Sequence, residues 1–450
     1  MRIHFIAIGG SAMHNLAIAL YKKGFEISGS DDVIFEPACS RLANYDLLPV
    51  SFGWFPEKIT KALDAVILGM HARLDNPELL KAQELGLKIY SYPAYIYEQS
   101  KEKLRVVIGG SHGKTTITSM ILHVLNYYKK NFDYLVGAQL AGFDTMVKIT
   151  DEAPVIIIEG DEYLASPIDR RSKFHLYNAN IAVISGIAWD HINVFPTFEE
   201  YITQFKLFIE TITPQGKLIY CENDLELRKI VVNSKAKIAR IPYSIPGNKV
   251  KDGVTYLLPK EVPLKVFGNH NLMNINAAKL VCEQLGISED DFVKAISTFT
   301  GAAKRLELLS TRKSTNVYKD FAHSPSKLKA TIEAVKAQFA DRKLIACIEL
   351  HTFSSLNKAF LAEYKNTMNN ADLAIVYIDE KTFQHKKMEP LSEFDVQTSF
   401  GDESILFFSE ASALSAYLKG LNFDNSNLLL MSSGNFGGLD LNNLALELDV

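Results

Sequence analysis

Short apolar runs alternate along the chain with segments whose apolar residues recur at helical spacing. Residues 3–8 form the first apolar run, and the segment after it carries, on one helical face, Met13, Leu16, Ala17 and Leu20. An apolar run of this length is typical of a buried strand, and the three-to-four-residue spacing is typical of a helix packed on a sheet. The pattern therefore predicts an α/β fold in which parallel sheets are covered by helices.

The same alternation continues along the chain and divides it into three parts. A charged stretch at residues 99–103 predicts a linker, and a second boundary is predicted near residues 299–304. A polar segment at residues 244–253 predicts a turn-rich insertion. Further strands are predicted at residues 25–28, 65–68, 106–108, 155–158, 181–184, 317–319, 344–348, 373–377, 405–408 and 428–431, and further helices at residues 117–125 and 327–339. We therefore predict three α/β domains, at residues 1–102, 103–299 and 300–450.

Composition and charge exclude several classes of protein. The chain has 450 residues, of which 47% are hydrophobic, enough apolar material for two to four folded domains. Lys and Arg total 48 and Asp and Glu total 52, so the net charge of −4 creates no global field for nucleic acid or an anionic membrane. The four cysteines are scattered, which is typical of a reducing compartment. Because no apolar stretch approaches the length of a signal peptide or membrane span, we expect a soluble, cytoplasmic protein.

The strongest chemical signal is a glycine-rich loop between a predicted strand and a predicted helix. Residues 109–116 read GGSHGKTT. Glycines allow backbone N–H groups to converge on phosphate oxygens, and the helix N-terminus adds its positive dipole end. Lys114 is expected to bridge the outer phosphates of ATP and Thr115 to bind Mg²⁺. The predicted nucleotide-binding residues of this loop are Gly110, Ser111, His112, Gly113, Lys114, Thr115 and Thr116.

Acidic and imidazole side chains follow two of the later strands. The strand predicted at residues 155–158 runs into the segment 159–162, EGDE, and the next strand leads to His191. Strand C-termini face the ligand crevice in a parallel sheet. Glu159 is therefore expected to hold Mg²⁺ and His191 a second cation, the alternative for His191 being a hydrogen-bonded loop residue.

A second glycine pair follows the first predicted strand. Gly9, Gly10 and Ser11 come directly after it, and Asp31 closes the next strand about twenty residues later, a spacing that suits a Rossmann-type pyrophosphate and ribose site. Alanine occupies two positions, 7 and 12, where that motif carries glycine. We interpret the segment as a cradle for a nucleotide diphosphate, so the chain combines an ATP site with a nucleotide-linked substrate.

Six groups of residues in this order resemble the motifs of the Mur ligase family, ATP-dependent amide-forming enzymes of peptidoglycan assembly. They lie at residues 4–10 with 28–31, 110–116, 159–162 with 190–191, 267–274, 304–307 and 320–325. The resemblance covers essentially the whole chain. It implies a Rossmann-like UDP-binding domain, a central P-loop ATPase-like domain with a mostly parallel sheet, and a Rossmann-like C-terminal domain that contacts the amine substrate and ADP.

The resemblance also implies roles for individual residues. Asn271 would meet adenine, Arg305 would lie near phosphate and Asp320 near ribose. The implied catalytic residues are Lys114, Glu159, His191 and Arg305, and the implied Mg²⁺ ligands are Thr115, Glu159 and His191. The UDP-substrate residues would be Gly9, Gly10, Ser11, Ser30 and Asp31.

The reaction implied by the family activates a carboxylate with ATP. The carboxylate of UDP-N-acetylmuramate is phosphorylated, and an amine attacks the acyl phosphate to give an amide, ADP and phosphate. The protein mainly positions the reactants and neutralises charge, with ATP and Mg²⁺ as cofactors. Arg305 falls in the third predicted domain, so we expect domain closure. We expect a monomer or homodimer.

Family members that use UDP-N-acetylmuramate differ in the amine that they add. One kind adds L-alanine, and the other adds the recycled tripeptide L-alanyl-γ-D-glutamyl-meso-diaminopimelate. The segments 161–163, 169–174 and 431–438 resemble the tripeptide-adding kind. Thr352 replaces an arginine of the alanine-adding kind, but residues 349–356 match neither kind closely, so the acceptor stays open. Lys206 lies in the region of a carbamylated lysine found in some members, the alternative being an ordinary solvated lysine.

Three other interpretations remain. A nicotinamide dehydrogenase would use Gly9, Gly10 and Asp31, but it leaves the loop at residues 110–116 unexplained. A nucleotide-sensing or binding module would bind ATP and the UDP-sugar without phosphate release. A folylpolyglutamate synthetase would share the ATP domain but not the N-terminal UDP motif.

Overall fold

The structure is a computed structural model that describes residues 1–302, 305–312 and 314–448. The chain clusters into two compact units. The first comprises residues 1–187, 197–244 and 277–292, and the second comprises residues 188–196, 245–276 and 293–450. The domain boundaries at residues 102 and 299 stay predictions.

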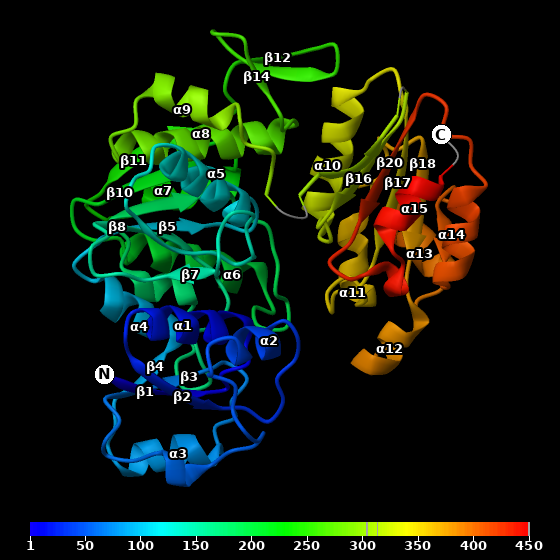
Figure 1. Cartoon of the computed structure of the whole chain (residues 1–450). Coiled ribbons are helices and arrows are strands. Elements are labelled where there is room, and N and C mark those ends of the chain that lie inside the picture. The colour runs from blue at the N-terminus through cyan, green and yellow to red at the C-terminus, as the bar shows by residue number, and fades with distance from the viewer. Residues whose placement is uncertain (303–304, 313, 449–450) are drawn as a thin grey trace. The chain divides into compact units, whose positions relative to one another are not determined.

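The N-terminal part of the first unit is a parallel sheet with the strand order β2-β1-β3-β4. Helices α1 and α4 lie on one face of this blue sheet and α3 on the other (Figure 1). The elements are β1 (Arg2–Ile6), α1 (Ser11–Lys22), β2 (Glu26–Ser30), α2 (Ala38–Ala43), η1 (Pro56–Lys58), β3 (Ala65–Leu68), α3 (Pro77–Glu84), β4 (Ile89–Ser91) and α4 (Tyr92–Ser100). The predicted strand at residues 3–8 ends early because Ala7 has φ +67°, which turns the chain.

The rest of the first unit is built around a larger sheet with the order β11-β10-β9-β5-β8-β6-β7. Its pairings are parallel except between β6 and β7, as predicted for the central part of the chain. Its elements are β5 (Leu104–Gly109), α5 (Lys114–Tyr127), β6 (Asp133–Leu135), β7 (Val147–Lys148), β8 (Val155–Glu159), η2 (Lys173–Tyr177), β9 (Ile181–Ile184), α6 (Phe198–Glu210), β10 (Lys217–Cys221), α7 (Leu225–Asn233) and β11 (Ala239–Tyr243). β5 and β8 are almost wholly buried, which is why they appear as continuous apolar runs.

The second unit contains a small antiparallel sheet and a larger, mostly parallel one. The small sheet joins β12 (Asn248–Lys251), β13 (Val254–Leu257) and β14 (Val262–Leu264). The larger sheet has the order β15-β16-β20-β17-β18-β19, and among the residues that the structure describes only its strands β15 and β16 pair antiparallel. Its strands are β15 (Glu307–Thr311), β16 (Asn316–Asp320), β17 (Lys343–Glu349), β18 (Leu373–Tyr377), β19 (Leu406–Phe408) and β20 (Ser426–Met431).

Helices cover both faces of the larger sheet of the second unit. Apolar side chains of α10, α11 and α13 form one buried cluster with the sheet, and those of α14 and α15 form another. The bounds are α10 (Pro325–Gln338), α11 (Lys358–Leu361), η3 (Ala362–Tyr364), α12 (Glu380–Lys386), α13 (Glu393–Phe400), α14 (Ala411–Lys419), η4 (Phe436–Gly438) and α15 (Leu441–Glu447). Two further helices, α8 (Asn269–Gln284) and α9 (Glu289–Ile296), contribute residues to both units. A sheet covered on both faces is the predicted Rossmann-like arrangement.

Two local predictions were only partly right. The predicted linker at residues 99–103 overlaps the end of α4, and β5 begins at Leu104. The predicted turn-rich insertion at residues 244–253 contains β12, a largely exposed strand whose polar residues resemble a loop. Among the described residues, no helix is long and apolar enough to cross a membrane.

Candidate active site

The glycine-rich loop connects the end of β5 to the start of α5, the position predicted for it. Gly110 has φ +126°, and a Cβ there would overlap Ser185, so a side chain does not fit. Gly113 is left-handed and directly precedes Lys114, the first residue of α5. The Ser111 N–H donates to Gly186 O at 3.0 Å, and Thr116 is buried in the first turn of the helix. The loop is thus a fixed turn at a helix N-terminus, which favours anion binding.

Lys114 is held at the base of this loop by a backbone carbonyl and a carboxylate. Its Nζ donates to Gly110 O and to Glu162 Oε2, each at 2.7 Å, and its side chain is 16% exposed. Burial lowers the pKa of Lys114, but the charges of Glu162 and Asp161 outweigh burial, so this pKa lies above its ordinary value. Lys114 is therefore a fixed cation at neutral pH.

Thr115 and Glu159 meet on the other side of the loop. Thr115 Oγ1 donates to Glu159 Oε1 at 2.7 Å, and the Gly137 N–H donates to Glu159 Oε2 at 2.7 Å. Burial raises the pKa of Glu159, although these two hydrogen bonds act in the opposite direction. Adjacent ligands of octahedral Mg²⁺ lie about 2.9 Å apart, and both donors are oxygens, so the pair fits the predicted ion.

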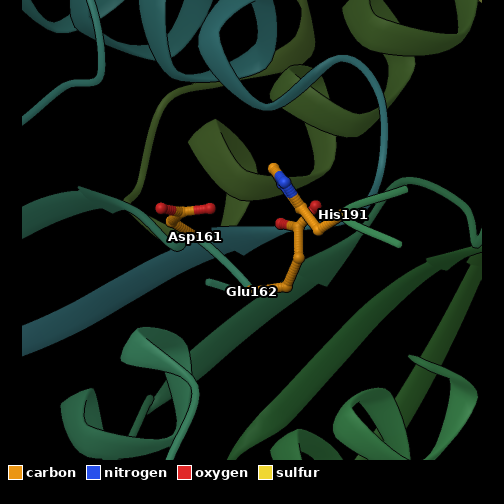
Figure 2. A group of neighbouring side chains, drawn as sticks. All are labelled: Asp161, Glu162 and His191. Carbon is orange, nitrogen blue, oxygen red and sulfur yellow. The ribbon is translucent and has the colours of Figure 1, made fainter. Parts of the chain in front are cut away.

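Asp161 and Glu162 follow β8 at the edge of the sheet, where Figure 2 draws their side chains. Lys173 Nζ donates to Asp161 Oδ2 at 2.6 Å. Tyr201 of α6 donates to Glu162 Oε1 at 3.0 Å, and its hydroxyl also contacts Ser111 Oγ at 2.8 Å. The structural roles of Glu162 and Tyr201 were not predicted from the sequence. Glu162 stands in the EGDE segment, which was its signal, whereas nothing local marks Tyr201.

The predicted nucleotide-diphosphate cradle lies at the ends of β1 and β2. The Gly9 N–H donates to Asp31 Oδ2 at 2.7 Å, and a Cβ at Gly9 would lie 2.9 Å from that oxygen. Burial, with the neighbouring Asp32, raises the pKa of Asp31. Ser30 Oγ is buried and has no hydrogen-bond partner among the described residues. Gly10 precedes α1, and Ser11 is its first residue. The five predicted UDP-substrate residues are therefore brought to one edge of the sheet.

Asn271, Arg305 and Asp320 belong to the second unit. Leu306 and Ala322 donate their N–H groups to the two Asp320 oxygens, each at 2.7 Å, which ties Asp320 to the residue after Arg305. The Arg305 guanidinium lies 4.8 Å from the centre of the Phe321 ring. Burial lowers the pKa of His270, the neighbour of Asn271, while Asp320 raises it and Arg305 lowers it.

The structure also shows where Asn271, His191 and Lys206 lie, and the roles predicted for them stay predictions. Asn271 is buried and donates to Phe267 O at 2.9 Å. His191, also drawn in Figure 2, has φ +55° in the loop at residues 188–196 of the second unit, and its N–H donates to Asp190 Oδ1 at 2.7 Å. A metal role for His191 stays a prediction. Lys206 is exposed on α6, and Lys304 lies outside the described residues.

The covered parallel sheets, the phosphate loop and the carboxylates at the strand ends define an ATP-dependent α/β enzyme. Three family models match the chain: "Mur ligase family, catalytic domain" at residues 2–103, "Mur ligase middle domain" at 108–282, and "Mur ligase, glutamate ligase domain" at 304–434. The UDP-N-acetylmuramate--L-alanine ligase of Clostridium kluyveri is 31% identical over 384 residues, 81% of each chain. The chain belongs to the Mur ligase family, and it is an ATP-dependent peptide-bond ligase of peptidoglycan synthesis.

Solved structures share the fold over the full chain. A murein peptide ligase from Psychrobacter arcticus superposes with a TM-score of 0.65 at 22% identity, covering 100% of this chain and 99% of that one. The UDP-N-acetylmuramate-alanine ligase from Thermotoga maritima gives a TM-score of 0.69 at 19% identity, covering 99% and 98%. Both similarities confirm the three-domain fold predicted from the sequence.

Proposed function

We propose that this chain joins the carboxylate of UDP-N-acetylmuramate to the amino group of L-alanyl-γ-D-glutamyl-meso-diaminopimelate through an acyl phosphate. The observation that carries the ligase chemistry is the fixed Lys114 cation at the start of α5, 2.7 Å from both Gly110 O and Glu162 Oε2. A carboxylate is a poor electrophile, and phosphorylation converts it into one that an amine attacks. L-alanine is the alternative acceptor, favoured by the names of the curated relatives.

In the proposed reaction, residues of the loop and of other parts of the chain have different roles in binding and phosphoryl transfer. Lys114 offsets the charge of the outer phosphates, and the loop N–H groups orient them. Thr115 and Glu159 would hold Mg²⁺, which supplies charge neutralisation at the phosphates. Gly9, Gly10, Ser11, Ser30 and Asp31 would hold the UDP group of the sugar acid. His191, Asn271, Arg305 and Asp320 keep the roles that the sequence predicts for them.

The choice of acceptor rests on segments at the strand ends. The segments 169–174 and 431–438 resemble the tripeptide-adding members, and Thr352 stands where alanine-adding members carry arginine. The murein peptide ligase from Psychrobacter arcticus and the UDP-N-acetylmuramate-alanine ligase from Thermotoga maritima both share the fold over nearly the whole chain, so the proposed acceptor depends on these segments and not on the fold. Cytoplasmic location and a monomer or homodimer stay predictions.

A phosphate-release assay with UDP-N-acetylmuramate, ATP and Mg²⁺ tests the acceptor. We expect kcat/KM for the tripeptide to exceed that for L-alanine by about 100-fold or more, because polar groups built to bind the longer acceptor stay unpaired with the shorter one. A preference for L-alanine would assign the alternative activity. Binding of ATP and the UDP-sugar without phosphate release with either acceptor would instead favour a binding module.

Glu159→Gln tests the proposed Mg²⁺ site. We expect the half-saturating Mg²⁺ concentration to rise about tenfold, because the amide keeps the size of the side chain but removes the ligand's charge. Titration of phosphate release against Mg²⁺ measures the change, and Glu226→Gln, at an exposed ion pair on α7, is the control. An unchanged Mg²⁺ requirement would remove Glu159 from the site.

A further inference from the structure

The segment after β8 forms a hairpin whose base lies at the phosphate loop. Residues 161–174, which we name the basic hairpin, leave β8 at Asp161 and return at Phe174. Leu164 and Ser172 form an antiparallel bridge. Backbone bonds join Phe174 N to Asp161 O at 3.1 Å and Lys173 N to Tyr163 O at 2.9 Å. Glu162, which binds Lys114, belongs to this base.

The basic hairpin is closed at its tip and anchored along one side. The Ser166 N–H donates to Asp169 O at 3.0 Å, and the Asp169 N–H donates to Ser166 Oγ at 3.0 Å. Ser166 and Ser172 are fully buried, and Ser172 Oγ donates to Gln204 Oε1 of α6 at 3.1 Å. The backbone of the tip is therefore held in place rather than free to follow a ligand.

The hairpin carries cations at three nearby positions, and two of them are already paired. Lys173 donates to Asp161 at 2.6 Å, and Arg171 forms a two-pronged bond with Asp169 at 2.9 and 2.7 Å. Arg170 is exposed and makes no hydrogen bond or ion pair with any residue that the structure describes. The tip thus presents one uncompensated guanidinium, a group that binds carboxylates through a planar fork.

We propose that Arg170 binds a carboxylate at the far end of a peptide acceptor and so distinguishes a peptide from a single amino acid. This inference rests on the proposed function. The tripeptide carries carboxylates on its second and third residues, whereas the single carboxylate of L-alanine adjoins the reacting amine.

The length of the hairpin decides which acceptor reaches Arg170. At no more than about 3.3 Å per residue, the leg over residues 161–166 extends at most about 16 Å from the base. In L-alanine, the carboxylate lies about 3 Å from the amine, so an alanine reacting at the base stays far from the tip. An extended tripeptide spans about 10 Å, the γ-linkage of its second residue lengthens this path, and the side chain of diaminopimelate carries a carboxylate further. Only the peptide acceptor is long enough to bring a carboxylate from the reacting amine at the base to within reach of the Arg170 side chain.

Arg170→Ala tests this role through the acceptor KM. We expect KM for the tripeptide to rise about fivefold, the effect of one exposed charge pair, with kcat and the KM values for ATP and UDP-N-acetylmuramate within about twofold of wild type. Turnover of L-alanine, where measurable, should not change. Arg171→Ala is the matched control, because Arg171 is already bound to Asp169 and its removal should leave the tripeptide KM unchanged.

A modified acceptor separates recognition from a structural role. Amidation of the diaminopimelate carboxylates should raise KM for wild type and leave KM of Arg170→Ala without a further rise. The inference would be overturned if Arg170→Ala left the KM for the tripeptide unchanged, or if it raised the KM values of all substrates equally. In either case the proposed function would stand. A wild-type enzyme that accepts only L-alanine would overturn both.

Discussion

Lys114→Met is expected to lower kcat for phosphate release about a thousandfold. The change removes the fixed cation at the start of α5, and loss of one preorganised charge-stabilising group in an active site costs about 100-fold to 1,000-fold. We choose the upper end because Lys114 is largely buried, where electrostatic interactions are least screened by water. Phosphate release with saturating ATP, UDP-N-acetylmuramate and acceptor measures the effect.

Removal of Lys114 also leaves the buried Glu162 carboxylate without its cation, and this destabilises the fold. The double variant Lys114→Met with Glu162→Gln controls for that effect, because the amide needs no counter-charge and still accepts from Tyr201. We expect the double variant to melt at a higher temperature than Lys114→Met and to remain inactive. If either variant kept a rate near that of wild type, the loop would not be the site of phosphoryl transfer.

The parts of the site that the sequence reveals are those built from neighbouring residues. The phosphate loop is one turn between a strand and a helix, so its glycines, lysine and threonine stand together in the sequence and in space. The parallel strands were also predictable from consecutive residues, because burial on both faces leaves continuous apolar runs such as β8.

The contacts that fix the loop are not local, and the sequence pattern did not reveal them. Glu162 binds Lys114 across 48 positions, and Tyr201 reaches Ser111 across 90. Such pairs depend on which strand ends are neighbours and how α6 packs, which periodicity alone does not fix. β12 was not predicted because it is largely exposed, so its sequence has no apolar pattern that distinguishes a strand from a loop.

The altered glycine motif of the first domain has a structural explanation. Ala7 stands where glycine was expected, and its φ of +67° is the left-handed conformation that glycine adopts without cost. The alanine tolerates this turn at a cost of about 1 kcal/mol. Gly9, by contrast, lies so close to Asp31 that a side chain there would disrupt the cradle. Of these two positions, glycine is kept at position 9, where space requires it, and replaced at position 7, where only the backbone angle favours it.

Arg305→Ala is expected to lower kcat about a hundredfold and to change KM for UDP-N-acetylmuramate by less than about twofold. In the role predicted for it, the guanidinium stabilises charge on the transferred phosphoryl group, and an interaction made mainly in the transition state affects kcat rather than ground-state binding. The structure supports a prepositioned side chain, because the guanidinium lies 4.8 Å from the Phe321 ring centre and Leu306 is bound to Asp320. Steady-state kinetics with UDP-N-acetylmuramate varied at saturating ATP separates the two parameters.

Arg305→Lys distinguishes the shape of this group from its charge. Lysine keeps the positive charge but lacks the planar fork. We therefore expect kcat of Arg305→Lys to be about tenfold higher than that of Arg305→Ala but still below that of wild type. The backbone contact between Leu306 and Asp320 does not involve the Arg305 side chain, so both variants should melt near the wild-type temperature. A rate for Arg305→Ala equal to that of wild type would exclude Arg305 from the chemistry, and a large rise in KM with unchanged kcat would reassign it to substrate binding.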